Sequence, residues 1–193
     1  ATLELPLPLA EYLAHYGFPI RYGYITRTWQ IDYYRTTFTT EVGSAEMPSA
    51  GRPFTPEVIT RLVAQGVIVA PMLLHTGVAS PEEHEPPYEE YYRIPRSTAA
   101  IVNRALQEHR RVIAVGTTVV RGLESVVDDR DLLHAGEGWT RLVIAPGDRV
   151  RSVSGLLTGL HEPRASHLAM LEAVGGREQL ERSYREALRE RYL

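Results

Sequence analysis

The chain has no cysteine, no lysine and no long apolar stretch. The absence of cysteine excludes disulfides, thiolate nucleophiles and cysteine-ligated zinc sites. No apolar run approaches the roughly 18–20 residues needed to span a bilayer, so we expect no membrane association. All 21 basic residues are arginine, and the planar guanidinium suits paired contacts to phosphate or carboxylate groups.

The charge balance argues against a uniformly basic surface but allows a local basic patch. The net charge is −3, which does not fit a uniformly basic nucleic-acid surface but allows a local basic patch. The first residues do not place a basic segment before an apolar one, so we expect no signal peptide and a cytoplasmic protein. Because the chain begins with Ala1 rather than Met, we expect a piece of a longer protein.

Composition divides the chain near residue 45. Residues 1–45 are rich in proline, tyrosine, threonine and arginine, and the stretch 21–38 has the composition of strands. We therefore predict an irregular, β-rich segment over 1–45 and an α/β domain over 46–193. The aromatic and arginine side chains of 21–38 could stack on nucleotide bases, or could form a β-ribbon with one buried face.

Five helices are expected after residue 46. The first has Thr55 as its N-cap, Pro56 at its first position and Gly66 after its end. The others are expected from Ser97 to about 110, from 117 to about 127, from Pro163 to the glycine pair 175–176, and over 177–192.

Buried strands are expected between these helices. The apolar run 67–74 fits one, although Pro71 weakens it, and 111–115 fits a second. Two later strands are predicted over 141–145 and 149–153, and a loop over 81–95. The alternation of strands and helices predicts a parallel or mixed sheet flanked by helices.

The loops that follow the first two strands are the expected ligand site. Ligands of parallel sheets bind at the carboxyl ends of the strands, so 75–77 and 116–118 would lie on one rim. The second loop opens a helix, where backbone N–H groups attract anions, and Arg121 follows one turn later. Two simpler readings stay open: Thr117 as an N-cap, and an ion pair between Arg121 and Glu124.

Two histidines stand in positions that suit acid/base chemistry. His75 follows a predicted strand, and His161 lies in a polar group with Thr158 and Glu162 before a helix. Thr158 or His161 could instead cap that helix. A metal site built from His75, His84 and His161 has no supporting spacing, and we expect no metal.

Taken together, a set of ordered motifs resembles the S-adenosylmethionine:tRNA ribosyltransferase-isomerase family of queuosine biosynthesis. The segment 115–125 resembles the family's Gly-Thr-Thr-Ser-x-Arg-Thr-Leu-Glu, and 156–163 resembles its Leu-Leu-Thr-Asn-Phe-His-x-Pro. The segment 48–55 resembles Pro-Thr-Ala-Gly-Leu-His-Phe-Thr, and 74–77 matches Leu-His-x-Gly. Gly-Trp-Thr at 138–140 and Pro-Gly at 146–147 fall in the expected order.

This resemblance implies a reaction and its residues. The family moves and isomerises the ribosyl part of S-adenosylmethionine onto 7-aminomethyl-7-deazaguanine in tRNA, and releases adenine and methionine. By resemblance, His75 and His161 would supply acid/base groups. The substrate would be bound by a larger set: Gly51, Phe54, Thr55, Gly77, Gly116, Thr117, Thr118, Arg121 and Thr158.

The sequence also departs from the family pattern. Arg52 and Pro53 replace the family's Leu-His, Gly159 and Leu160 replace its Asn-Phe, and Tyr88 stands in a loosely kept paired-histidine loop. We expect the family's inserted barrel-like domain to be absent. A divergent paralogue that binds an adenosyl or other small ligand without this catalysis therefore stays open, as does a structural half that needs a missing partner. The oligomeric state is not predicted.

Overall fold

The computed structural model describes residues 4–20, 26–77, 88–161 and 165–192, and its contacts divide the chain into units 1–35 and 36–193. The first unit contains the helix α1 (Leu9–Tyr16) and the 3₁₀ helix η1 (Ile31–Tyr33). No helix among the described residues is both long and apolar enough to cross a membrane.

The β-rich character predicted for the amino-terminal segment is wrong for its described residues, 4–20 and 26–45, which contain no strand. The aromatic side chains lie at helical rather than alternating spacing. Tyr12 and Tyr16 are four residues apart, and their ring centroids lie 4.9 Å from each other. Trp29 and Tyr33 repeat that spacing at 4.8 Å. Aromatic content alone does not separate the two periods.

The observed division falls ten residues before the predicted one, because residues 36–45 bond to the second unit. The Thr37 hydroxyl donates to the Phe54 carbonyl at 2.8 Å. The Ala45 N–H donates to the Thr76 carbonyl, also at 2.8 Å. These two long-range bonds fasten the segment to the loop before α2 and to the loop after β1.

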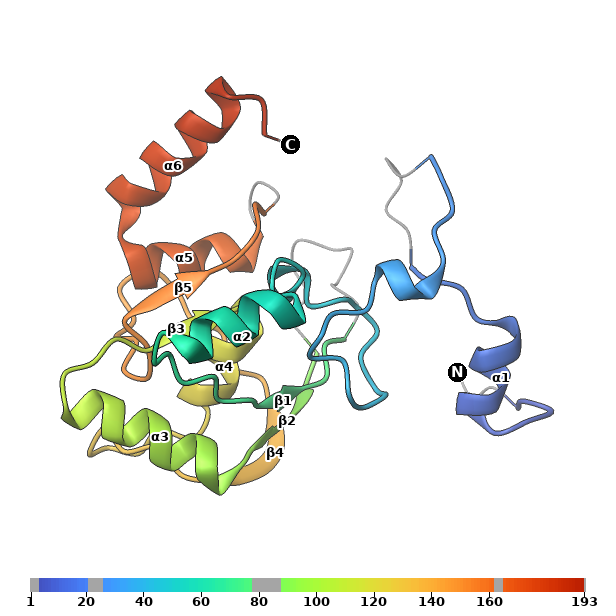
Figure 1. Cartoon of the computed structure of the whole chain (residues 1–193), viewed down its shortest axis with the longest axis horizontal. Coiled ribbons are helices and arrows are strands. Elements are labelled where there is room, and N and C mark those ends of the chain that lie inside the picture. Colours follow the sequence, from blue (N-terminus) through green and yellow to red (C-terminus); the bar gives the residue numbers. More distant parts are fainter. Residues whose placement is uncertain (1–3, 21–25, 78–87, 162–164, 193) are drawn as a thin grey trace. The chain divides into compact units, whose positions relative to one another are not determined.

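The second unit is a mixed α/β arrangement with two small sheets (Figure 1). Strands β1 (Leu73–Leu74), β2 (Glu90–Ile94) and β4 (Gly136–Thr140) form an antiparallel sheet in the order β1-β2-β4. Strands β3 (Ile113–Val115) and β5 (Gly155–Leu157) form a parallel pair. The expected α/β class with a parallel or mixed sheet and flanking helices is confirmed at this level, and the absence of the family's barrel-like domain stays a prediction.

Several strand predictions are corrected. Only the last two residues of the run 67–74 pair, and Pro71, which has no N–H to donate, lies just before them. The predicted loop 81–95 contains β2 in its described part, where Glu90, Tyr92 and Ile94 alternate with Tyr91 and Arg93. Residues 81–87 lie outside the described residues.

The two strands predicted on either side of the 146–147 turn are also absent. The backbone N–H groups of Arg151 and Ser152 donate to the Glu124 carboxylate instead of to a neighbouring strand. The turn itself is present: Ala145 N–H bonds the Asp148 carboxylate at 2.8 Å, and Asp148 N–H bonds the Ala145 carbonyl at 3.1 Å. Side-chain acceptors therefore replace a strand ladder along this stretch.

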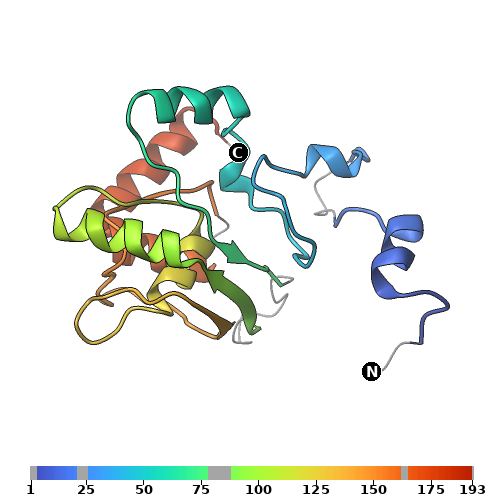
Figure 2. The same ribbon diagram turned by 60° about the horizontal axis from the view of Figure 1, so that its bottom comes forward.

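The helix α4 (Thr117–Glu124) is what joins the two sheets. It packs against β1, β2 and β3, and its Val120 and Leu123 are 0% and 3% exposed (Figure 1, Figure 2). Gly122 has no side chain, which lets Met72 approach: an added Cβ would lie 2.5 Å from the Met72 methyl carbon. The strands predicted over 67–74 and 111–115 lie in different sheets rather than in one parallel sheet, and the loops that follow them are linked by α4 instead.

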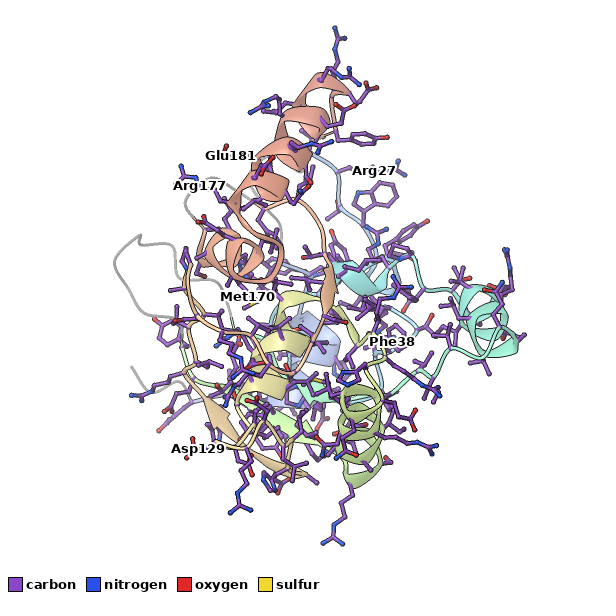
Figure 3. The ribbon with its side chains drawn as sticks, turned by 90° about the vertical axis from the view of Figure 1, so that its left-hand side faces the viewer. Arg27, Phe38, Asp129, Met170, Arg177 and Glu181 are labelled. Atoms are coloured by element: carbon purple, nitrogen blue, oxygen red, sulfur yellow. The ribbon has the colours of Figure 1, made fainter. Side chains whose placement is uncertain are left out.

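The predicted helices are found with shifted ends. They are α2 (Pro56–Ala64), α3 (Arg96–Gln107), α4, α5 (Ser166–Gly175) and α6 (Arg177–Arg189). The N-cap of α3 is Pro95 rather than Ser97, and the predicted start at Pro163 lies outside the described residues. In Figure 3, Met170 marks the packed side of α5, whereas Arg177 and Glu181 lie on α6, which has no buried residue among those described.

A cap substitution tests the local reading of α2. The Thr55 hydroxyl accepts from Val58 N–H at 3.3 Å, and Thr55→Ala should lower the free energy of unfolding by about 1 kcal/mol. Thr60→Ala is the matched control, because the Thr60 hydroxyl only donates back to the Pro56 carbonyl within the same helix. Urea unfolding measures both, and equal losses would contradict the cap assignment.

Candidate functional site

Three of the motif loops meet at the start of α4. Gly116 has φ = 101°, and its N–H donates to the Leu157 carbonyl at 2.9 Å. A Cβ added to Gly116 would lie 3.8 Å from the Ala50 Cβ, and one added to Gly159 would lie 4.0 Å from the Ser49 hydroxyl. The 3₁₀ turn η2 (Ser49–Gly51), the 116–118 turn and the 157–159 segment are therefore neighbours.

The two threonines of the second loop lie in the first turn of α4. Thr117 is 6% exposed, and the residue before it, Gly116, is the N-cap. The N-cap reading of Thr117 is therefore wrong. The Thr118 hydroxyl lies 3.4 Å from where a Gly116 Cβ would stand, so any larger residue at 116 would crowd it.

Arg121 is held across the fold, not along its helix. Its Nη1 forms an ion pair with Glu90 on β2, and both side chains are only 12% exposed. Its Nε donates to the Leu142 carbonyl at 3.0 Å. The other Glu90 oxygen accepts from Gly77 N–H at 3.0 Å, so the loop after β1 is tied to the same carboxylate.

One nitrogen of this guanidinium has no hydrogen-bond partner among the described residues. Arg121 Nη2 is buried and has no hydrogen-bond partner among the residues that the structure describes. A buried, unsatisfied donor costs about 1–3 kcal/mol, and more on a charged group. Nη2 is therefore the atom of this cluster most in need of an acceptor.

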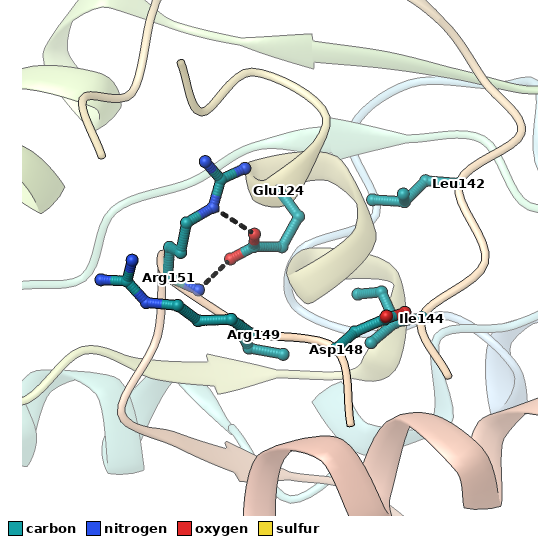
Figure 4. A pocket seen from close by; sticks show the side chains of 7 residues that line it. Glu124, Leu142, Ile144, Asp148, Arg149 and Arg151 are labelled. Carbon is teal, nitrogen blue, oxygen red and sulfur yellow. Dashed lines mark hydrogen bonds and ion pairs between the residues drawn. The ribbon is translucent and has the colours of Figure 1, made fainter. Parts of the chain in front are cut away.

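The alternative of an ion pair between Arg121 and Glu124 is wrong, because Glu124 has other partners. Its side chain is 6% exposed and accepts from Arg151 N–H at 2.7 Å (Figure 4). It also accepts from the N–H and hydroxyl of Ser152, both at 2.6 Å. A cavity of about 400 Å³ lies beside it, lined also by Leu142, Ile144 and other residues. Glu124 fastens α4 to the chain before β5.

His161 is held on three sides. Its Nε2 shares a hydrogen bond of 2.9 Å with the Thr158 hydroxyl. The backbone N–H of His161 donates to the Tyr184 hydroxyl of α6 at 2.8 Å. Its ring stacks on His167 of α5, with centroids 4.6 Å apart and planes 5° from parallel. The N-cap of α5 is Ala165, so the capping role considered for Thr158 and His161 is wrong.

Burial keeps both imidazoles uncharged near neutral pH. It lowers the pKa of His161 to about 4, with a smaller contribution from the charge of His167. Burial also lowers the pKa of His167, and the Arg121 cation adds to this while Glu46 and Glu90 oppose it. A neutral imidazole can accept a proton, so His161 suits the role of a base.

His75 has a different environment. Its ring stacks on Tyr91 with centroids 6.0 Å apart, and its Nδ1 lies 3.4 Å from the Ser44 hydroxyl. Tyr91 follows Glu90 on β2, and successive side chains of a strand point to opposite faces. His75 therefore lies with the side chains that face away from Arg121, and its described contacts are not shared with His161.

The remaining predicted residues have structural contacts. Gly51 is buried, and an added Cβ would lie 3.4 Å from the Phe38 ring. Phe54 and Phe38 have ring centroids 6.1 Å apart, and Thr55 caps α2. A substrate-binding role for Gly51, Phe54 and Thr55 stays a prediction.

Sequence reasoning missed three residues of the cluster: Glu90, His167 and Tyr184. The alternation of 90–94 was a usable signal for Glu90, whereas nothing local marks His167 or Tyr184, which reach His161 from two later helices. Within the described ranges, no three His, Asp or Glu side chains are grouped as metal ligands would be, and His84 lies outside those ranges.

The fold and the cluster define an α/β domain with a buried polar site at a helix start. The chain belongs to the queuosine biosynthesis protein family, whose sequence model matches residues 1–193. Three of the motifs that led to this expectation meet at the start of α4.

Two similar curated proteins are named S-adenosylmethionine:tRNA ribosyltransferase-isomerase. That of Moorella thermoacetica is 41% identical over 167 residues, covering 82% of this chain and 48% of the relative. That of Carboxydothermus hydrogenoformans is 43% identical over 167 residues, covering 82% and 49%. The chain thus spans about half the length of the curated relatives it matches.

A solved structure is similar as well. The crystal structure of the S-adenosylmethionine tRNA ribosyltransferase of Thermotoga maritima aligns with a TM-score of 0.60 at 34% identity. The alignment covers 74% of this chain and 47% of that protein. The likeness therefore extends to the fold.

Substitution of Glu124 tests its structural role. Glu124→Gln should lower the free energy of unfolding by about 1–3 kcal/mol, because buried charge-assisted hydrogen bonds are weakened. Glu108→Gln is the control: its partner Arg104 is 78% exposed, and a surface pair contributes about 0–1 kcal/mol. Chemical unfolding at pH 7 compares them, and a Glu124→Gln loss no larger than the control's would contradict the assignment.

The His161 environment predicts a pH effect on stability. An imidazole whose pKa falls from 6.5 to about 4 on folding contributes stability above pH 6.5 that is lost as the pH drops toward 4. The unsubstituted protein should therefore lose more stability between pH 7 and pH 5 than His161→Gln. Urea titrations at the two pH values measure the difference, and an equal loss in both proteins would refute the burial account.

Proposed function

We propose that this chain supplies the S-adenosylmethionine site of a tRNA ribosyltransferase-isomerase, which moves a ribosyl group to a 7-aminomethyl-7-deazaguanine base of tRNA. The carrying observation is the Arg121 guanidinium, fixed by Glu90 and by the Leu142 carbonyl, with a buried Nη2 left unpaired within the described part of the chain. The family membership and the names of its relatives supply the reaction.

Arg121 is proposed to bind the carboxylate of the methionine end. Two of its three nitrogens are engaged, so the direction of Nη2 is set before any ligand arrives. A ligand carboxylate would satisfy Nη2 with a charge-assisted hydrogen bond, and no side chain would have to be reordered. Glu90 neutralises the arginine charge and holds the guanidinium in one position.

His161 is proposed as the base. The sulfonium of S-adenosylmethionine acidifies the adjacent ribose carbon, and removal of that proton gives an ylide-like carbon. Opening of the ribose then expels adenine, which must gain a proton, and the amine of the acceptor base attacks before methionine leaves. A neutral His161 oriented by Thr158 has the protonation state that the first step needs.

The other proposed groups surround this pair. Gly116, Thr117 and Thr118 would bind the adenosyl part, where the motif segments 48–55 and 156–163 adjoin them. His75 is retained as a proposed acid/base group and Gly77 as a binding residue, since the Gly77 N–H is tied to the same carboxylate as Arg121. That the acceptor is a tRNA and that the protein is cytoplasmic are also parts of this proposal.

The direct test follows S-adenosylmethionine in the presence and absence of acceptor tRNA. Calorimetry measures binding, and chromatography of the same samples measures released adenine. Binding with tRNA-dependent adenine release supports the proposal. Binding without release favours a ligand-binding paralogue or a site completed by other residues, and no binding excludes S-adenosylmethionine as the ligand of this chain.

Arg121→Lys tests the carboxylate contact. Lysine keeps a positive charge beside Glu90 but cannot present the forked guanidinium, so affinity for S-adenosylmethionine should fall about tenfold or more. Affinity for an adenosyl thioether that lacks the amino-acid carboxylate should change little. Arg149→Lys, at a 77% exposed arginine, is the control. Equal weakening toward both ligands would show that Arg121 does not bind the carboxylate.

A further inference from the structure

We propose that His167 is a positioning residue for His161: its ring covers one face of the His161 imidazole and holds it against Thr158, away from water. The pairing of the two rings is independent of the proposed function, and only its consequence for catalysis rests on that function. Nothing in the sequence motifs pointed to His167.

The geometry of the stack carries the inference. A centroid separation of 4.6 Å with planes 5° apart is a close parallel arrangement, and the rings come from different elements. His161 follows β5, and His167 lies in the first turn of α5. Because the docking of α5 places His167, the position of one imidazole face is set by helix packing rather than by the local chain.

The remaining freedom of His161 is removed by other groups. The Tyr184 hydroxyl of α6 accepts from the His161 N–H at 2.8 Å and lies 3.4 Å from its carbonyl oxygen. The Thr158 hydroxyl fixes the Nε2 edge of the ring. With the backbone and one edge fixed, His167 supplies the contact that limits tilting of the ring.

The charges around the pair favour two neutral rings. His167 faces the Arg121 cation of α4, the Glu90 carboxylate of β2 and the Glu46 carboxylate of the 41–46 segment, while His161 faces His167 and the Tyr184 hydroxyl of α6. Burial opposes charging either ring in this partly buried site. The Arg121 cation also opposes a charge on His167, and a charged His167 would oppose a charge on His161. His167 thus protects the base form of His161.

The experiment compares His167→Ala and His167→Phe with the unsubstituted protein by NMR titration of the His161 imidazole. Removal of the ring in His167→Ala should raise the pKa of His161 from about 4 toward 6.5, because its face is exposed to water. His167→Phe keeps a flat ring and should keep the pKa low. Ser166→Ala, at the exposed neighbouring position, is the control and should have no effect.

An unchanged His161 pKa in His167→Ala would overturn the proposal, as would a rise of the same size in Ser166→Ala. If His167→Ala does not fold, His167→Phe and His167→Leu decide the question: the flat ring should preserve the low pKa better than the aliphatic side chain, and equal pKa values would contradict the role of the stack.

Activity gives a second readout. If the His161 pKa returns to 6.5 in His167→Ala, only about a quarter of the base is neutral at pH 6, so kcat should fall about fourfold between pH 8 and pH 6. The unsubstituted protein should be nearly flat over that range, with KM changed less than kcat. If no protein releases adenine, the proposed function fails while the NMR titration still decides the role of His167.

Discussion

The buried ion pair between Arg121 and Glu90 is the contact on which the rest of the site depends. It joins α4 to the central strand of the three-stranded sheet, and through Glu90 it also holds the Gly77 loop. Breaking a buried pair by removing one partner leaves an uncompensated charge, at a cost of about 3–5 kcal/mol. The pair therefore sets both where α4 lies and where the unpaired Nη2 points.

The second feature is the stack of two neutral histidines built from elements late in the chain. His161 is anchored from α6 by Tyr184 and faced from α5 by His167. The proposed base, uncharged at pH 7, and a fixed cation in the same cluster would be complementary to the zwitterionic, sulfonium-bearing substrate that we propose.

The third feature is the Glu124 carboxylate, which holds α4 to the segment before β5. Its acceptor oxygens are used there and do not pair with Arg121.

The sequence predicted some of this and missed the rest for identifiable reasons. Helices with local signals were found, such as α2 with its Thr55 cap and its glycine after the end. Strands were less predictable, because the N–H groups of residues 151 and 152 bond the distant Glu124 and β2 lies in an acidic, tyrosine-rich stretch. The loops 75–77 and 116–118 were placed on one rim by a parallel-strand argument. The contact that ties the Gly77 loop to α4, Glu90 with Arg121, spans 31 residues and has no local signature.

The most direct measurement is a crystal structure of the protein with S-adenosylmethionine bound. The account predicts a carboxylate oxygen of the ligand within hydrogen-bond distance of Arg121 Nη2, with the ribose facing the His161 imidazole and the Glu90 pair intact. A ligand bound elsewhere, for example in the cavity beside Glu124 and Arg151 with Nη2 still unpaired, would contradict it.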